Sequence, residues 1–182
     1  MKEGKGSLKT VISGSFRKYF KEVSQTSKKF KKMEIEVLAP LPGRVVTPGK
    51  EFARLSTDDK YKSPEEIEID FMRNIFMADF LYVVDEEGYA GESVATEIGY
   101  ARLAKIPIIL SEKIVRFGKE VPKEVISILK KSAASILTIK NLNLEKIEQM
   151  RKIRQNELTL KEIKVLKKQI KNLLKKLKSI EL

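Results

Sequence analysis

The stretch 80-FLYVVDEEGYAGESVATEIGYA-101 carries most of the information about the fold. It begins with an apolar run, Phe80–Val84, typical of a strand buried on both faces, and continues through a glycine-containing loop into a helix. In an open α/β sheet, ligands bind outside the carboxyl ends of the strands, where loops and helix N-termini meet. The stretch therefore predicts a ligand site, with Glu97 in the first turn of the helix and facing the pocket.

The expected position of Glu97 has two interpretations. The helix dipole and nearby free N–H groups would favour the ionised carboxylate, which suits nucleophilic attack on a sugar carbon. Acidic residues are also common in first turns simply because they cap helices. Position alone leaves both a functional and a structural role open.

The composition excludes several classes of chemistry. The chain has 182 residues, of which 42% are hydrophobic, and this suits one domain with a respectable core and a possible appendage. It contains no cysteine and no histidine, so disulfides, zinc sites of the Cys/His type, thiol nucleophiles and histidine-based triads are excluded. Acid–base chemistry would fall to Asp, Glu, Tyr or Lys, and we expect no metal and no cofactor.

The charge is concentrated at the two ends of the chain. The net charge is +12, but residues 1–32 carry ten basic and two acidic side chains, and residues 151–182 carry eleven and three. The region of the expected site is mildly acidic. The longest apolar runs, Phe80–Val84 and Ile106–Leu110, are too short to span a bilayer, and the N-terminal residues lack a signal-peptide core, so we expect a cytoplasmic protein without a membrane span.

Strands and helices are expected to alternate along the chain. Ser63 reads as a helix cap, because proline follows it at the first helical position and acids occupy the first turn. The long loop between 43 and 59 is expected to lack regular structure, as functional lids and disordered segments do. The predicted strands are 8–13, 35–39, 80–84, 106–110 and 135–139, and the predicted helices are 16–30, one starting at 63, 93–105 and 121–131. This alternation predicts a doubly wound, mostly parallel five-stranded sheet of the flavodoxin or Rossmann-like three-layer type, covering residues 1–140.

Residues 141–182 are expected to form a basic helical extension. Apolar residues within it step by three and four, which makes a heptad seam two and a half repeats long. A seam this short is marginal as an independent coiled coil, so packing against the domain or a second subunit is favoured. A basic helix on nucleic acid or on an anionic membrane surface is the alternative. The seam residues are Ile163, Leu166, Ile170, Leu173, Leu177 and Ile180.

Three ordered motifs resemble the nucleoside 2-deoxyribosyltransferase superfamily. Residues 12–17 (ISGSFR) are similar to the Cys-Gly-Ser-Ile-Arg turn of its deoxyribonucleoside 5'-monophosphate N-glycosidase branch, and residues 78–80 (ADF) lead into the third strand. Residues 93–101 (SVATEIGYA), followed by 105–108 (KIPI), resemble the family's Glu-(Leu/Ile)-Gly-x-Ala helix and the Lys-Pro-(Ile/Val) strand after it. The three motifs cover roughly residues 8–112.

The resemblance implies that Glu97 is the nucleophile and attacks the anomeric carbon from the face opposite the departing base. It also implies that the 13–17 turn and Ser93 contact the sugar and any 5'-phosphate, for which backbone N–H groups, hydroxyls and a guanidinium near a helix N-terminus are suited. For Ser15 and Ser93, turn and cap roles remain open, and Arg17 has the alternative of a solvated helix residue. The expected substrate-binding residues are Ser13, Gly14, Ser15, Phe16, Arg17, Tyr89, Gly91 and Ser93.

The chain departs from the family pattern at two acidic positions. The transferases have an aspartate six residues before the nucleophile, where this chain has Gly91 followed by Glu92. The second catalytic acid is assigned to Asp70, which is offset by one residue from the usual spacing, with Glu68 as the fallback. Three tyrosines could position Glu97 or the sugar, although core packing is the commoner role of aromatics there. These are Tyr19, Tyr89 and Tyr100.

Three functions follow from these observations. The first is cleavage or transfer at the N-glycosidic bond of a nucleoside or its 5'-monophosphate, with a homodimer or higher homo-oligomer implied by the resemblance. The second is a catalytically inactive module that binds or senses nucleotides, and the third is docking on nucleic acid through the basic ends. The chain has no Gly-x-Gly-x-x-Gly after the first strand, no Gly-x4-Gly-Lys-(Ser/Thr) and no Pro-Gly-Gly-x-Gly-Thr, which disfavours dinucleotide, P-loop and cytokinin-activating phosphoribohydrolase chemistry.

Overall fold

A computed structural model describes most of residues 7–127 and a few residues beyond them. The described residues are 7–50, 52–119, 121–123, 126–127, 135–136, 142, 144–145, 147–149, 151–152 and 156. The chain divides into two compact units, Met1–Leu144 and Glu145–Leu182. The heptad seam at 163–180 and most of the helix expected at 121–131 lie outside the described residues. Within the described part, no helix is both long and apolar enough to cross a membrane.

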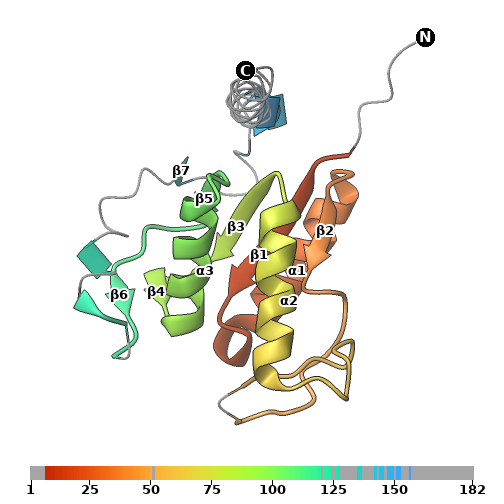
Figure 1. Cartoon of the computed structure of the whole chain (residues 1–182), viewed down its shortest axis with the longest axis vertical. Helices are drawn as coiled ribbons and strands as arrows, with labels where there is room; N and C mark the ends of the chain where they lie inside the picture. Colours follow the sequence, from red (N-terminus) through yellow and green to blue (C-terminus); the bar gives the residue numbers. More distant parts are fainter. Residues whose placement is uncertain are drawn as a thin grey trace, which may run out of the picture. The chain divides into compact units, whose positions relative to one another are not determined.

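Five parallel strands form the main sheet of the first unit. The strands are β1 (Lys9–Gly14), β2 (Glu36–Ala39), β3 (Phe80–Val84), β5 (Ile108–Leu110) and β7 (Ser135–Ile136), in the order β2-β1-β3-β5-β7 (Figure 1). This confirms the predicted doubly wound α/β class. The chain moves outward from β1 to β2 and then returns to place β3 on the other side of β1, so the carboxyl ends of β1 and β3 form the topological switch point.

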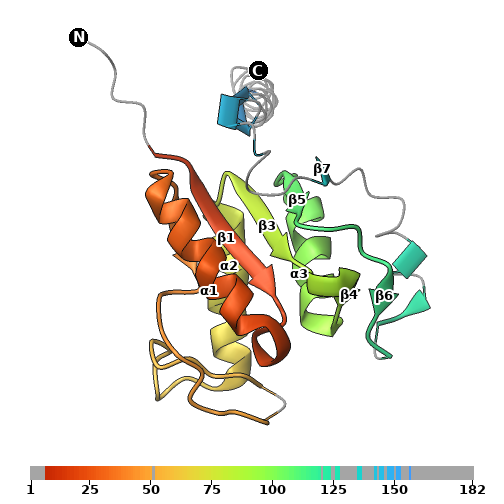
Figure 2. The same cartoon turned by 180° about the vertical axis from the view of Figure 1, so that it is seen from behind.

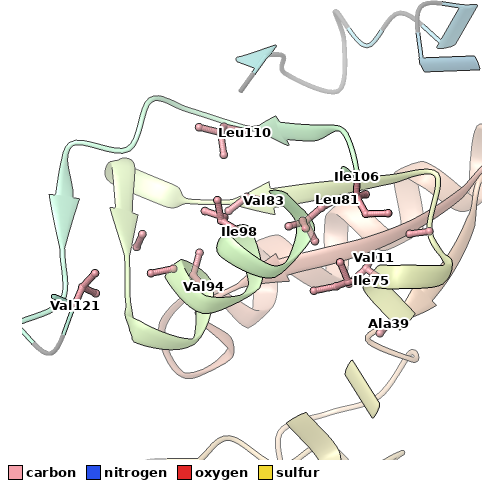
Figure 3. Packing of buried hydrophobic residues seen from close by; sticks show 14 residues of the cluster. Val11, Ala39, Ile75, Leu81, Val83, Val94, Ile98, Ile106, Leu110 and Val121 are labelled. Carbon is pink, nitrogen blue, oxygen red and sulfur yellow. The ribbon is translucent and has the colours of Figure 1, made fainter. Parts of the chain in front are cut away.

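Helices cover both faces of this sheet. Helix α1 (Phe16–Lys32) lies on one face, and α2 (Pro64–Met77) and α3 (Glu92–Leu103) lie on the other (Figures 1 and 2). Strand β3 contributes side chains to both layers: the Phe80 and Tyr82 rings contact the Phe30 ring of α1 at centroid distances of 5.9 and 5.1 Å. Leu81 and Val83 point the other way, into the apolar cluster beneath α2 and α3 (Figure 3). The continuous apolar run of β3 is explained by this two-sided burial.

The start of α2 is confirmed in atomic detail. The Ser63 hydroxyl accepts a hydrogen bond from the Glu66 N–H at 3.2 Å, and the Glu66 carboxylate accepts one from the Ser63 N–H at 2.7 Å. Pro64 occupies the first helical position, where its missing N–H costs nothing. This reciprocal capping box directs the chain out of the preceding loop and into the helix.

Strand β5 begins two residues later than predicted, because the end of α3 uses the intervening residues. Lys105 adopts a left-handed conformation with φ of 57°, and the Ile106 N–H donates to the Ala101 carbonyl at 2.8 Å. Pro107 then carries no N–H, so the ladder to β3 starts at Ile108. A small second sheet, β4 (Tyr89–Ala90) paired with β6 (Arg116–Phe117), was not predicted.

The loop between β2 and α2 has few regular elements, as expected, but it is held together by specific contacts. Val45 and Leu55 form an antiparallel bridge, and Leu55 is buried. The Arg54 guanidinium donates to the carbonyls of Asp59 and Lys62 at 2.9 and 2.7 Å. We call this arrangement the Arg54 clamp. Because it fixes both ends of the 54–62 segment, this part of the loop can act as a wall of a cavity.

Candidate active site

A cavity of about 760 Å³ opens at the switch point of the sheet. Its walls come from the end of β1, the first turn of α1, helix α2, the start of α3 and the loop between β2 and α2. The volume is within the range of small-molecule sites. Nine of the ten predicted site residues line it, namely Gly14, Ser15, Phe16, Arg17, Asp70, Tyr89, Gly91, Ser93 and Glu97.

The tenth residue, Ser13, lies at the end of β1 and is fully buried. The glycine that follows it is required by packing: a Cβ on Gly14 would lie 2.9 Å from Val23 Cγ2 and 3.0 Å from the Val84 carbonyl oxygen. The backbone at the end of β1 therefore approaches both α1 and β3 more closely than a side chain would permit. This close approach brings the 13–17 turn to the cavity wall.

The position of Glu97 in its helix differs from the prediction. The N-cap of α3 is Gly91, in an extended conformation, and the helix begins at Glu92, so Glu97 lies in the second turn and not in the first. The helix starts early because β4 ends at Ala90, which leaves Gly91 in the extended conformation of a cap. Ser93 is thus inside the helix and does not cap it.

The expected ionisation of Glu97 is also wrong. Burial raises the pKa of Glu97 from its ordinary 4.5 to about 8; the Ser13 hydroxyl lowers it and the charge of Glu68 raises it further. The helix dipole acts mainly within the first turn, so in the second turn loss of solvation dominates. At neutral pH the carboxyl of Glu97 is therefore mostly protonated.

Two polar atoms beside the cavity have no hydrogen-bond partner among the described residues. They are Oγ of Ser13 and Oε2 of Glu97, both inaccessible to solvent. Buried polar atoms in native proteins are nearly always paired, and exceptions concentrate where a ligand or a chemical role supplies the partner. The Ser13 hydroxyl is nevertheless close enough to the Glu97 carboxyl to lower its pKa, so the two groups form one polar centre in the floor of the site.

The two candidates for the second acid have different surroundings. Asp70 pairs with Lys62 and with Nη1 of Arg73 (3.1 Å), and the Lys62 ammonium is the main reason why the pKa of Asp70 is lowered. Glu68 is close enough to Glu97 for its charge to raise the pKa of the latter. The structure therefore brings Glu68 together with Glu97 and holds Asp70, at the same cavity, in an ion pair.

Of the three tyrosines singled out in the sequence, only Tyr89 lines the cavity. The Lys18 ammonium lies over its ring, 3.6 Å from the centroid, a cation–π contact that holds the ring in place. A Cβ on Gly91 would lie 3.6 Å from the Tyr89 hydroxyl, an ordinary contact. The backbone at Gly91 thus has room for a Cβ.

Residues that the sequence did not single out also shape the site. The cavity walls include Phe52, Leu55, Asp58 and Asp59 from the loop, for which no motif or periodicity gave a signal.

Asp85 was likewise missed, although an acid directly after a buried strand is a recognisable signal. It is fully buried, and its Oδ1 accepts hydrogen bonds from the Ser111 hydroxyl at 2.7 Å and the Glu112 N–H at 3.0 Å. Burial raises the pKa of this carboxyl. Asp85 ties the end of β3 to the end of β5 and thereby positions the loop that leads to Gly91.

The described residues contain no cluster of acidic side chains arranged to hold a metal ion. The polar side chains that line the cavity carry carboxyls, hydroxyls, a guanidinium and an ammonium group.

Comparison with known proteins found solved structures that are similar to this chain. No family model matches the chain, and a search of curated proteins gave no match. A conserved protein from Enterococcus faecalis V583 aligns with a TM-score of 0.45 and 16% identity, over 79% of this chain and 99% of that one. A 2-deoxyribosyltransferase from the psychrotolerant bacterium Bacillus psychrosaccharolyticus aligns with a TM-score of 0.47 and 14% identity, over 76% of this chain and 95% of that one.

Proposed function

We propose that this protein cleaves or transfers the N-glycosidic bond of a nucleoside or its 5'-monophosphate, with Glu97 as the nucleophile. The observation that carries the proposal is the polar centre of Ser13 and Glu97, whose two solvent-inaccessible oxygens lack partners beside a cavity at the switch point. Glycosidic chemistry requires a pair of carboxyls at such a site, and Glu68 supplies the second.

The mechanism starts from the proton on the Glu97 carboxyl. In the free protein the proton resides on Glu97, held there by burial. Transfer of this proton to Glu68 produces a carboxylate nucleophile and a carboxylic acid together, without changing the charge of the pair. Glu97 then attacks C1' of the sugar, the C1'–N bond breaks with its electron pair moving to the base, and Glu68 protonates the leaving base.

The covalent sugar is released in a second step. Water attacks C1' in a hydrolase and a second base attacks it in a transferase, and in both cases the bond to Glu97 breaks and its oxygen recovers the electron pair. The proton lost by the incoming group returns to Glu68, which restores the starting charge. This scheme uses only residues at the cavity.

Features of the 13–17 turn support a 5'-monophosphate as a substrate. Ser15 is the N-cap of α1, yet its side chain makes no capping hydrogen bond, so its hydroxyl is available to a ligand. The first turn of α1 carries no acidic residue. Its dipole and the Arg17 guanidinium both favour an anion at this end of the cavity.

A nucleotide-binding module without turnover is the second candidate. It is favoured by Gly91, which stands where the transferases have an aspartate, and by the ion pair that engages Asp70. In this case the nucleotide would bind in the same cavity, but no base would be released.

The proposal is tested with a panel of deoxynucleosides and their 5'-monophosphates, with and without a second base, while free base is followed by chromatography. Glu97→Gln is the test variant because it keeps the shape of the side chain and removes the ionisation. Glu86→Gln is the matched control, since Glu86 is exposed and lies outside the cavity.

Base release that is lost in Glu97→Gln and kept in Glu86→Gln is the expected result. Release that persists in Glu97→Gln would overturn the role of the nucleophile. Binding without release from any member of the panel would favour the binding module, and dependence on the second base would separate a transferase from a hydrolase.

A further inference from the structure

A second, smaller cavity adjoins the first at the start of α1. It has a volume of about 250 Å³ and lies between the start of α1 and five residues of the loop, namely Val45, Thr47, Pro48, Gly49 and Ala53. It shares Phe16, Arg17 and Ala53 with the larger cavity. The two cavities therefore border each other at these residues.

The charged residues that the structure describes at this smaller cavity are cations. They are Arg17, Lys18 and Lys21. No carboxylate of the described residues forms an ion pair with any of the three. We call this cavity the basic pocket.

We infer that the basic pocket binds the outer phosphates of a nucleoside 5'-diphosphate or 5'-triphosphate whose nucleoside occupies the larger cavity. This inference rests on the proposed function for the nucleoside, and it extends the substrate class from the monophosphate to the polyphosphates. Three cations around one small cavity favour a ligand that carries several negative charges.

The position of the basic pocket supports this assignment. A 5'-phosphate at the 13–17 turn lies next to Arg17, which belongs to both cavities. Each further phosphate would extend away from the sugar toward Lys18 and Lys21. The volume of about 250 Å³ is several times the share of about 30 Å³ that one water has in the liquid, so the basic pocket has room for phosphate groups.

The first experiment measures whether the basic pocket binds phosphate anions that carry no nucleoside. Inorganic tripolyphosphate and orthophosphate are titrated into the full chain in metal-free buffer by calorimetry. Lys21→Ala is the test variant, because Lys21 lines the basic pocket and not the larger cavity. Lys28→Ala is the matched control, an exposed lysine of the same helix outside both cavities.

We expect tripolyphosphate to bind more tightly than orthophosphate, and Lys21→Ala to weaken it about tenfold, which corresponds to about 1.4 kcal/mol. Lys28→Ala should leave the affinity unchanged. Equal affinities for the two anions, or equal losses of affinity in the two variants, would mean that the anions bind nonspecifically to a basic surface. Either result would overturn the inference.

The second experiment compares a nucleoside 5'-mono-, di- and triphosphate as substrates. The expected result is a KM that falls as phosphates are added in the wild type, and a smaller fall in Lys21→Ala. Base release with the same KM for all three would overturn this inference and leave the proposed function intact. Tripolyphosphate binding that depends on Lys21, without base release from any nucleotide, would support this inference and overturn the proposed function. Tighter binding of a 5'-phosphorylated oligodeoxynucleotide than of the triphosphate would indicate that the basic pocket belongs to a groove for a single DNA strand. This result would overturn the assignment.

Discussion

The substitution Glu97→Gln should make the stability of the protein less sensitive to pH. Below pH 4.5 the carboxyl of Glu97 is protonated in both the folded and the unfolded chain. Between pH 4.5 and about 8 the unfolded chain releases this proton while the folded chain keeps it, because burial raises the pKa of the folded state. The folded state binds more protons in this window, so its stability falls as the pH rises.

The size of this effect follows from the two pKa values. The interval between 4.5 and about 8, at about 1.4 kcal/mol for each pH unit, gives about 5 kcal/mol in total. The wild type should lose this amount relative to Glu97→Gln as the pH rises from about 4 to about 9. Glutamine has nearly the same shape and does not ionise, so contributions from all other carboxyls cancel in the comparison.

The assay is urea unfolding at a series of pH values, followed by far-UV circular dichroism because the chain has no tryptophan. The quantity of interest is the difference in unfolding free energy between the wild type and Glu97→Gln, with Glu86→Gln as the control. A difference that stays constant between about pH 4 and pH 9 would mean that Glu97 ionises normally in the folded protein, and the argument from burial would be refuted.

Three further predictions concern the surroundings of the site. Glu68→Gln should lower the pKa of Glu97, because it removes a nearby negative charge, whereas Asp70→Asn should leave it unchanged; the same pH series of unfolding curves measures both. Asp85→Ala should destabilise the protein by about 1–3 kcal/mol in urea unfolding, because the Ser111 hydroxyl and the Glu112 N–H lose their acceptor, and Asp85→Asn should keep most of the stability; equal losses would contradict this account. Arg54→Ala should speed hydrogen exchange at residues 54–62 with little change in global stability, and unchanged exchange would show that the Arg54 clamp is not what orders the loop.

The sequence predicted those parts of the fold that depend on neighbouring residues. The run Phe80–Val84 is apolar at every position because helices cover both sides of β3, and this pattern is visible without the structure. Ser63 caps α2 through Glu66, three residues away, so the signal lies within one turn. Nine of the ten site residues named from the sequence line the cavity, and six of these nine belong to the ordered motifs, namely Gly14, Ser15, Phe16, Arg17, Ser93 and Glu97.

The parts that failed depend on residues far apart in the chain. The pKa of Glu97 is set by burial together with Ser13 of β1 and Glu68 of α2. These residues come together only in the folded chain, so no local sequence pattern predicts their effect. The helix dipole was the only local influence visible in the sequence, and it is the weaker one in the second turn. The Arg54 clamp was invisible for a related reason: its acceptors are backbone carbonyls, which every residue has.

The raised pKa of Glu97 is compatible with its proposed role as a nucleophile. With a pKa of about 8, Glu97 is ionised in about one molecule in ten at pH 7, so forming the carboxylate costs about 1.4 kcal/mol of free energy. This cost is small compared with the roughly 8–23 kcal/mol by which enzymes typically lower activation barriers. The same burial that raises the pKa removes water from the carboxylate and holds the proton that the leaving base requires. In the proposed scheme the reactive pair of carboxyls keeps one proton, so kcat/KM should fall as the pH rises through about 8, where that proton is lost. A kcat/KM that instead rises with pH toward about 8 would mean that Glu97 must lose its proton to solvent, and would contradict the transfer to Glu68.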